Sequence, residues 1–279
     1  MAWIMFLNTW GGNVPGYFTY IQNMAMHVDI FCLSEVHNHY GTESLHAFPS
    51  PTNRVGAVEL KQFRLLQDLL ADTHQGYYAE SYRGLHDCQP GQQSPIGLAM
   101  FIRRSIPAHS VSSMLINREY GQLFNGTSSA SRVIQSAFVI LGEKQHLLAH
   151  THGLWTPKGK IDTDERDLQS TNIIEHLNRR FEEPFSSKPD QNIILGGDFN
   201  YTRSLRAYKA LAAGKIFGQD GADVLTDGTP QWYETRTAYY KKPLKEANFI
   251  FVSSGLPYTL TIDRTAPSDH AALILKVTA

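Results

Sequence analysis

The decisive stretch of the sequence is Ile193-Ile194-Leu195-Gly196-Gly197-Asp198-Phe199-Asn200, an apolar run that ends abruptly in a carboxylate and a carboxamide. The run predicts a buried β-strand, and in a strand residues i and i+2 point to the same side. Asp198 and Asn200 could therefore face one cation or one phosphate. An Asx-turn that closes the strand explains the same two residues, so this stretch alone leaves both interpretations open.

Short polar groups lie at the tips of other apolar runs in the same way. Residues 30–33 lead into Ser34-Glu35, residues 147–149 into His150-Thr151-His152, and residues 4–7 into Asn8, whereas Ser268-Asp269-His270 leads into residues 271–275. Acids, amides and imidazoles that follow strands from distant parts of a chain indicate convergence on one pocket.

In their order along the chain, these residues resemble the motifs of the endonuclease/exonuclease/phosphatase superfamily, which pancreatic deoxyribonuclease and the abasic-site endonucleases typify. The most specific motifs are Gly-Asp198-Phe-Asn200 and Ser-Asp269-His270, and the resemblance runs from about Phe6 to Leu275. It implies an α/β fold, a four-layered α/β sandwich in which two packed mixed β-sheets are flanked by helices. It also implies metal-dependent cleavage of a phosphate ester.

Length and composition agree with this class. A chain of 279 residues with 42% apolar content can bury one large core, and we expect a single domain over residues 1–279 and a monomer. We expect no membrane span, because no apolar run approaches the roughly 20 residues that one needs. The two cysteines, Cys32 in an apolar run and Cys88 in a polar loop, form no disulfide framework and favour a reducing, cytoplasmic location.

The periodicity of the chain predicts alternating helices and strands. Apolar residues at helical spacing predict an amphipathic helix over residues 59–71 and a second helix that begins with a capping pair, Asp162 and Glu165. Predicted strands cover residues 2–7, 97–102, 132–141, 146–151 and 249–252, with a hairpin turn near Gly142. The segments 84–95, 117–131 and 219–236 are predicted to be loops.

The resemblance implies a metal site built from oxygen ligands. Glu35 is the candidate for the principal ligand, with Asn8 beside it, and Asp269 would assist a second cation or hold His270. Carboxylate and amide oxygens suit Mg²⁺ or Mn²⁺, and such a cation neutralises the charge that develops on a phosphate under attack.

The remaining site residues are assigned to water and phosphate. Asp198 would orient or deprotonate the attacking water, and His270 would act as base or stabilise charge; the sequence leaves open which of the two takes the proton. Asn200 would donate to a phosphate oxygen, and His152 would contact the phosphate or the leaving oxygen. Arg132 is a candidate phosphate clamp, although a solvated Arg is more common. Arg166 and Gln169 fit the family pattern, with a structural role favoured.

One position departs from the family. Where its members usually have an acid that polarises the histidine, this chain has Asn248, directly before residues 249–252. An amide can hold an imidazole, and it supplies no charge to stabilise imidazolium. We therefore expect His270 to be less basic than in relatives that keep the acid.

Two other readings compete. His37-Asn38-His39 and His150-Thr151-His152 are His-x-His pairs, which a zinc hydrolase would use. Gly153 and Leu154 follow His152 where the common binuclear zinc pattern has an acid and a histidine. A noncatalytic binding module on the same fold is the third reading, and Asn248 keeps it open.

Charge does not identify the substrate. A formal net charge of −1 and a pI near 6.9 give no global attraction to nucleic acid. The resemblance still favours a nuclease acting on DNA or RNA, with small phosphate esters, inositol phosphates or phospholipid headgroups as the alternative. Local basic clusters, Lys158/Lys160 among them, could form a rim around the cleft, and a solvated surface explains them equally well.

Overall fold

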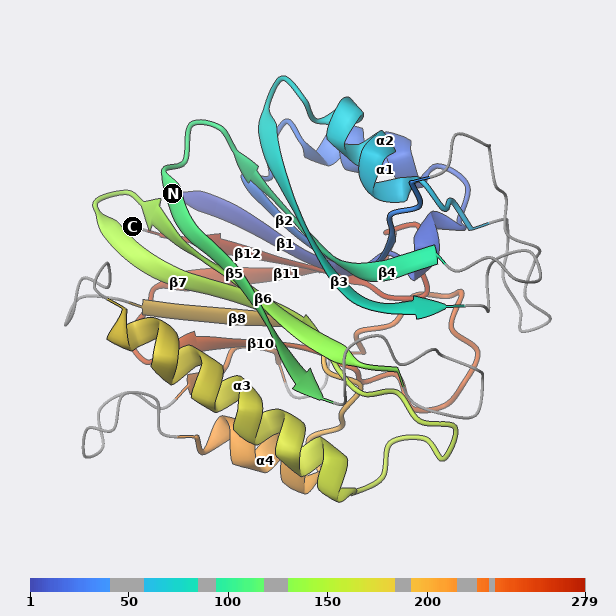
Figure 1. Ribbon diagram of the computed structural model, residues 1–279, viewed down its shortest axis with the longest axis vertical. Helices are drawn as coiled ribbons and strands as arrows, with labels where there is room; N and C mark the ends of the chain where they lie inside the picture. The colour runs from blue at the N-terminus through green and yellow to red at the C-terminus, as the bar shows by residue number, and fades with distance from the viewer. Residues whose placement is uncertain are drawn as a thin grey trace.

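The computed structural model describes residues 1–40, 58–84, 94–117, 130–183, 192–214, 225–230 and 234–278 (Figure 1). Cys88 and most residues of the three predicted loops lie outside these ranges.

The first half of the chain contains β1 (Ala2–Asn8), η1 (Trp10–Gly12), α1 (Tyr17–Met24), β2 (Ile30–His37), α2 (Gln62–Leu69), β3 (His74–Gly84), β4 (Ser94–Arg103), β5 (Ala108–Asn117) and β6 (Arg132–Leu141). The second half contains β7 (Lys144–His152), α3 (Asp164–Glu182), β8 (Asn192–Asp198), α4 (Arg206–Ala212), β9 (Leu225–Asp227), β10 (Asn248–Ser253), β11 (Tyr258–Asp263) and β12 (Ala272–Val277).

The strands form two six-stranded mixed sheets. The first sheet has the order β11-β12-β1-β2-β4-β3 and the second the order β5-β6-β7-β8-β10-β9. Each sheet contains one parallel pair at its middle, β1 with β2 and β7 with β8, and its other pairs are antiparallel. Because the polar residues of a parallel pair emerge at the same end, this topology gathers them at one edge of the sandwich.

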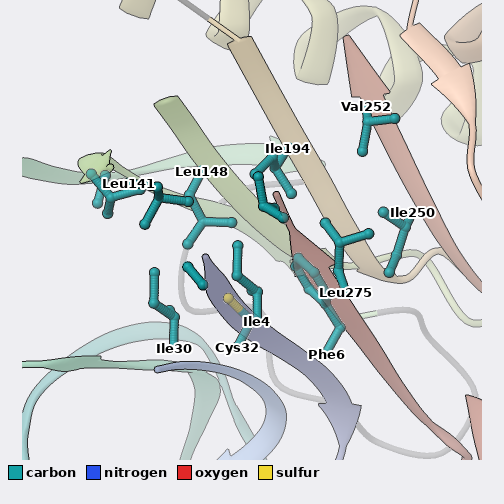
Figure 2. Close-up of a cluster of buried hydrophobic side chains, with 14 of the residues drawn as sticks. Ile4, Phe6, Ile30, Cys32, Leu141, Leu148, Ile194, Ile250, Val252 and Leu275 are labelled. Atoms are coloured by element: carbon teal, nitrogen blue, oxygen red, sulfur yellow. The ribbon is translucent and has the colours of Figure 1, made fainter. Parts of the chain in front are cut away.

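Alternation along the strands produces four layers. Ile4 and Phe6 of β1 point into the core between the sheets, together with Ile194 of β8 and Ile250 of β10 (Figure 2). Met5 and Leu7 point the other way, onto α1 and α2. The second sheet packs its outer face against α3 and α4 (Figure 1). The central strands are apolar on both faces because one face packs on the opposite sheet and the other on helices. The predicted α/β sandwich is confirmed.

Most predicted elements are present, with changes at their ends. The predicted strands correspond to β1, β4, β6, β7 and β10. The predicted helix over residues 59–71 is shorter, because α2 spans Gln62–Leu69. The predicted cap at Asp162 is wrong by one residue: the side chain of Thr163 accepts the hydrogen bond from the Arg166 N–H.

The two glycines of the opening stretch are required by close packing. A Cβ on Gly196 would lie 2.5 Å from the ring of Phe6 in the opposite sheet. A Cβ on Gly197, whose φ is 138°, would lie 2.1 Å from the carbonyl oxygen of Thr151 in the neighbouring strand. The glycines thus allow β8 to approach both the other sheet and β7 closely, just before it presents Asp198.

None of the helices in the described ranges is long and apolar enough to cross a membrane.

Buried neutral histidines predict a loss of stability in mild acid. Burial lowers the pKa of His150 to about 3 and the pKa values of His74, His146 and His176 to about 4. Since these imidazoles titrate near pH 6.5 when the chain is unfolded, the unfolded state binds more protons between about pH 6.5 and pH 4. We expect the free energy of unfolding to fall as the pH drops through this window, by up to about 1.4 kcal/mol per pH unit for each histidine.

Urea denaturation at several pH values between about 7 and 4.5 measures this slope. His176→Asn should make the slope shallower, because it removes one of the titrating groups. A free energy of unfolding that stays constant down to the lower pH would show that these imidazoles are protonated inside the fold.

Candidate active site

Six polar residues meet where the two sheets present the same edge. Asn8 ends β1, Glu35 lies in β2, His152 ends β7, and Asp198 ends β8. The other two are Asn248, which begins β10 opposite Asp198, and His270, which lies just before β12.

Asn8 connects the two sheets. Its Nδ2 donates to Glu35 Oε1 and to Asp198 Oδ2, both at 3.0 Å, while its Oδ1 accepts from the Trp10 N–H at 3.0 Å. The backbone hydrogen bond orients the amide with its nitrogen toward the carboxylates. One side chain therefore holds a carboxylate from each sheet at the same point.

Glu35 sits on a β-bulge in β2. The register of β2 on β4 shifts between Ser34 and Val36, and Glu35 has a positive φ of 56°. The Thr9 hydroxyl donates to the carbonyls of Ser34 and Glu35 and holds this conformation. A strained residue in a bulge re-aims its side chain, and such strain is concentrated at functional sites.

The two carboxylate oxygens of Asp198 have different partners. Its Oδ1 accepts the Asn200 N–H at 2.9 Å, which is an Asx-turn, while its Oδ2 faces Asn8 and lies 3.3 Å from His270 Nε2. The expectation that Asp198 and Asn200 point the same way as i and i+2 of one strand is wrong. The strand ends at Asp198, and Asn200 adopts a left-handed φ of 54°.

His270 is held from behind by Asn248. The Nδ1 of the imidazole lies 2.7 Å from Asn248 Oδ1, so Nδ1 carries the proton it donates. The His270 N–H donates to the Ser268 hydroxyl, which in turn donates to the Asn8 carbonyl. With Nδ1 protonated, the Nε2 of a neutral His270 presents a lone pair to the carboxylate of Asp198.

Charge and burial keep both members of this pair unprotonated near neutral pH. Burial and the positive charge of Arg236 lower the pKa of His270 well below its usual value. Burial by itself would raise the pKa of Asp198, but the positive charges of protonated His270 and His152, of Arg236 and of Lys160 outweigh it and hold that pKa below its usual range. Two unprotonated acceptor atoms 3.3 Å apart can hold one proton between them.

His152, Asn200 and Arg132 meet at one side of Asp198. His152 Nε2 lies 3.6 Å from Glu35 Oε1 and 3.8 Å from Asp198 Oδ2, and burial lowers its pKa to about 4. Asn200 Nδ2 and Arg132 Nε both donate to the carbonyl of Gly153, at 3.2 and 3.0 Å. This carbonyl fixes both side chains directly beside His152.

Asp269 is paired with a residue that the sequence did not single out. Its Oδ2 lies 2.6 Å from Arg236 Nη1, and Oδ1 lies 3.7 Å from His270 Nε2. Arg236 belongs to a segment without helical or strand periodicity, which was predicted to be a loop. The one feature of the sequence that favours an extended backbone there is the flanking pair of β-branched residues, Thr235 and Thr237.

Of the Lys158/Lys160 cluster, one member reaches the site. The Nζ of Lys160 donates to the Glu246 carbonyl, two residues before Asn248, whereas Lys158 is exposed on the same loop. Arg166 and Gln169 have the structural role that the sequence favours. The Arg166 guanidinium donates to the carbonyls of Gly159 and Ile161, and Gln169 Oε1 accepts the Leu154 N–H at 2.8 Å, so α3 shapes the loop that carries Lys160.

Two of the four imidazoles of the zinc alternative have other side chains as polar partners. His37 Nδ1 is 3.3 Å from the Ser94 hydroxyl, and His150 Nε2 is 2.8 Å from Gln135 Oε1. Only His152 of the four faces the carboxylates. Across the described ranges, no group of three or more His, Cys, Asp and Glu side chains is arranged to hold a metal ion by itself.

The oxygen donors fit a hard cation that keeps part of its water shell. Mg²⁺ commonly uses one or two carboxylates and completes its coordination with water and substrate oxygens. Of the three acids at the site, Glu35 is the most accessible, with 25% of its side chain exposed against 2% for Asp198 and 12% for Asp269. Glu35 could therefore offer an oxygen to such a cation, with the Asp198 carboxylate close by.

Replacing Asn248 with Asp should make His270 more basic. A carboxylate 2.7 Å from Nδ1 favours imidazolium, so the pKa of His270 should rise. Within the described residues, the Asn248 Nδ2 is buried without a hydrogen-bond partner, so an oxygen in its place removes no bond. If neutral His270 takes a proton in the reaction, the rising limb of the pH–rate profile should move to higher pH.

The measurement is a pH–rate profile together with an NMR titration of the His270 ring. Asn248→Ala is the control that removes the acceptor and adds no charge. A profile and a titration that both stay unchanged in Asn248→Asp would show that the two side chains are not coupled.

Comparison with solved structures identifies the fold. The human nocturnin catalytic domain with bound sulfate has a TM-score of 0.64 at 16% identity, covering 99% of this chain and 94% of that one. ANGEL2, a 2′,3′-cyclic phosphatase, has a TM-score of 0.66 at 15% identity, covering 99% and 95%. A mannosyl-6-phosphatase from Bacteroides thetaiotaomicron has a TM-score of 0.60 at 13% identity, and both chains are covered completely. No curated protein matched the sequence.

These structural similarities establish the fold, and a match to a family model establishes which family the chain belongs to. The model of the Endonuclease/Exonuclease/phosphatase family matches residues 5–270, which include all six residues of the site. Because this match spans nearly the whole chain, the chain belongs to the Endonuclease/Exonuclease/phosphatase family.

Proposed function

We propose that this protein is a divalent-metal-dependent phosphoesterase in which Asp198 and His270 accept the proton of the attacking water. Members of its family are phosphoester hydrolases. The observation that supports the proposal most is the 3.3 Å approach of His270 Nε2 to Asp198 Oδ2, in a pair held by Asn8 and Asn248.

Each side chain of the site has a defined part in the proposal. A water molecule hydrogen-bonded to Asp198 Oδ2 and His270 Nε2 would be oriented by both and would lose its proton to the pair. His152 and Asn200 lie beside Asp198 and would contact the phosphate oxygens. Arg132, fixed at the Gly153 carbonyl, would add positive charge at that side.

The metal has its own place in the proposal. Glu35, with Asn8 and Asp269 nearby, would hold Mg²⁺ or Mn²⁺, which would supply positive charge to the nonbridging phosphate oxygens. Asn8 contributes by holding Glu35 and Asp198 together, because its Nδ2 faces both carboxylates.

A metal titration tests the proposed function. Turnover should require Mg²⁺ or Mn²⁺ and disappear with a chelator, and Glu35→Gln should raise the metal concentration needed for half-maximal turnover while the protein remains folded. Full turnover by metal-free protein would overturn the proposal. Retention of Zn²⁺ that depends on His37 and His39 would instead favour the zinc hydrolase.

A substrate panel separates the activities within the family. It comprises DNA, RNA, bis-p-nitrophenyl phosphate, p-nitrophenyl phosphate, inositol phosphates and sphingomyelin. Nuclease activity, which the sequence favours, predicts cleavage of the first two. Hydrolysis of none, by folded protein with metal present, would support a noncatalytic binding module.

A further inference from the structure

Arg236 lies on a backbone segment that is fixed from two sides. The Thr235 hydroxyl accepts the N–H groups of Ala247 and Asn248, at 3.0 and 3.1 Å. On the other side, Arg236 forms a β-bridge with His270, and the Thr237 N–H donates to the Asp269 carbonyl. The segment thus lies between the residues that hold His270 and His270 itself, and its position is set by both.

The guanidinium of Arg236 is enclosed at the site and retains donor capacity. Arg236 is 7% exposed, and its guanidinium carbon lies 4.2 Å from the ring centre of Tyr240. Nη1 meets Asp269, whereas Nε, in the part of the chain that the structure describes, is buried without a hydrogen-bond partner. A buried donor without a partner is costly, and a ligand oxygen would satisfy it.

Lys160 approaches the same place from the opposite loop. Arg166 fixes this loop through its carbonyls, and the Lys160 ammonium donates to the Glu246 carbonyl. An ammonium group has three N–H donors, so two remain after this bond. Burial lowers the pKa of Lys160 to about 8, and its charge acts on both Asp198 and His270.

The partners of the two cations differ in charge. Arg236 has a carboxylate partner, Asp269, while the hydrogen-bond partner of Lys160 is a neutral carbonyl. A partly buried ammonium on a neutral acceptor gains from an incoming anion, because its positive charge is poorly solvated. The site therefore has cationic donors on two loops, both outside the acids and imidazoles of the family motifs.

We infer that Lys160 and Arg236 form a clamp for the nonbridging oxygens of the substrate phosphate, and that the clamp makes the protein prefer phosphomonoesters over phosphodiesters. This inference rests on the proposed phosphoesterase function and favours its phosphatase alternative over the nuclease that the sequence favours. A monoester dianion offers three charged oxygens to the two cations, whereas a diester offers two oxygens that share one charge. The forked guanidinium and the point charge of the ammonium are the two side chains best suited to such a group.

A matched pair of ligands tests the clamp without turnover. Methyl phosphate and dimethyl phosphate differ by one methyl group and, near pH 7, by about one charge. In ³¹P NMR titrations with a chelator present, the protein should bind methyl phosphate more tightly. Lys160→Gln and Arg236→Gln should each weaken methyl phosphate binding about tenfold and dimethyl phosphate binding about threefold or less.

The chain offers matched control variants. Lys158→Gln removes the same charge from an exposed position on the same loop and should change neither affinity. Arg236→Lys keeps the charge that faces Asp269 and loses the fork, so it reports on the clamp if Arg236→Gln does not fold. Urea denaturation verifies that each variant is folded.

The outcomes separate this inference from the proposed function. The clamp would be overturned if the Lys160 and Arg236 variants bound both ligands more weakly to the same extent, or if their affinities were unchanged. It would also be overturned if the parent protein did not bind methyl phosphate. In Mg²⁺, the ratio of kcat/KM for p-nitrophenyl phosphate to that for bis-p-nitrophenyl phosphate should fall about tenfold in Lys160→Gln. Correct binding results without hydrolysis of any ester would leave the clamp standing and overturn the proposed function.

Discussion

Asp198→Asn should lower turnover by about 10²- to 10⁴-fold while the protein remains folded. The amide keeps the size of the carboxylate and can keep the Asx-turn to the Asn200 N–H, because Oδ1 remains an acceptor. What changes is Oδ2, which becomes an N–H₂ group that faces Asn8 Nδ2 and His270 Nε2. The pair can then no longer hold the proton of a water molecule.

Turnover at saturating substrate and the free energy of unfolding together measure this effect. His270→Ala should lose turnover to a similar extent, and the double variant should lose little more than either single variant, because residues that act as a unit are not additive. Losses that multiply in the double variant would indicate independent roles. Near-normal turnover in Asp198→Asn would show that this carboxylate takes no part in the reaction.

Gly197→Ala should destabilise the fold by about 3 kcal/mol or more. The new Cβ would lie 2.1 Å from the Thr151 carbonyl oxygen, which belongs to the backbone of β7 and cannot rotate away. The residue also has a φ of 138°, a conformation that L side chains rarely adopt. Relief requires β8 to separate from β7 at the point where Asp198 pairs with His152 in the sheet register.

Gly255→Ala separates the steric cost of the new Cβ from the conformational cost of the positive φ. Gly255 also has a positive φ, 83°, but a Cβ there would meet nothing within 4 Å. Its replacement should cost about 1 kcal/mol, which is the conformational part alone. Urea denaturation of both variants measures the difference, and equal costs would contradict the steric explanation for Gly197.

The sequence by itself determined the inner strands and the class of fold. Residues 193–197 and 249–252 are apolar or glycine at every position, because these strands are covered on both faces. Such a pattern depends on composition alone and is visible along the chain. The outer strands β3, β5 and β11 were not predicted, since they carry mixed, partly exposed residues whose pairing is decided by their neighbours.

The residues of the candidate site also divide into those that the sequence predicted and those that it did not. Asn8, Glu35, Asp198 and His270 could be named from the sequence because each directly follows or precedes an apolar run, or fits a family motif. Arg236 and the position of Lys160 could not, because both lie in irregular segments. The place of Arg236 depends on the neighbouring Thr235 hydroxyl, which accepts the Asn248 N–H, and the place of Lys160 depends on Arg166, which donates to the Gly159 carbonyl.

Only the tertiary structure decided how the named residues face one another. The sequence could not show that Asn8 points its Nδ2 at two carboxylates, or that Asp198 uses one oxygen for a turn and the other for the site. Those arrangements arise where two sheets meet, and contacts between sheets have no local periodicity. Side-chain chemistry is therefore encoded locally, whereas its geometry is set by packing between elements that are far apart in the chain.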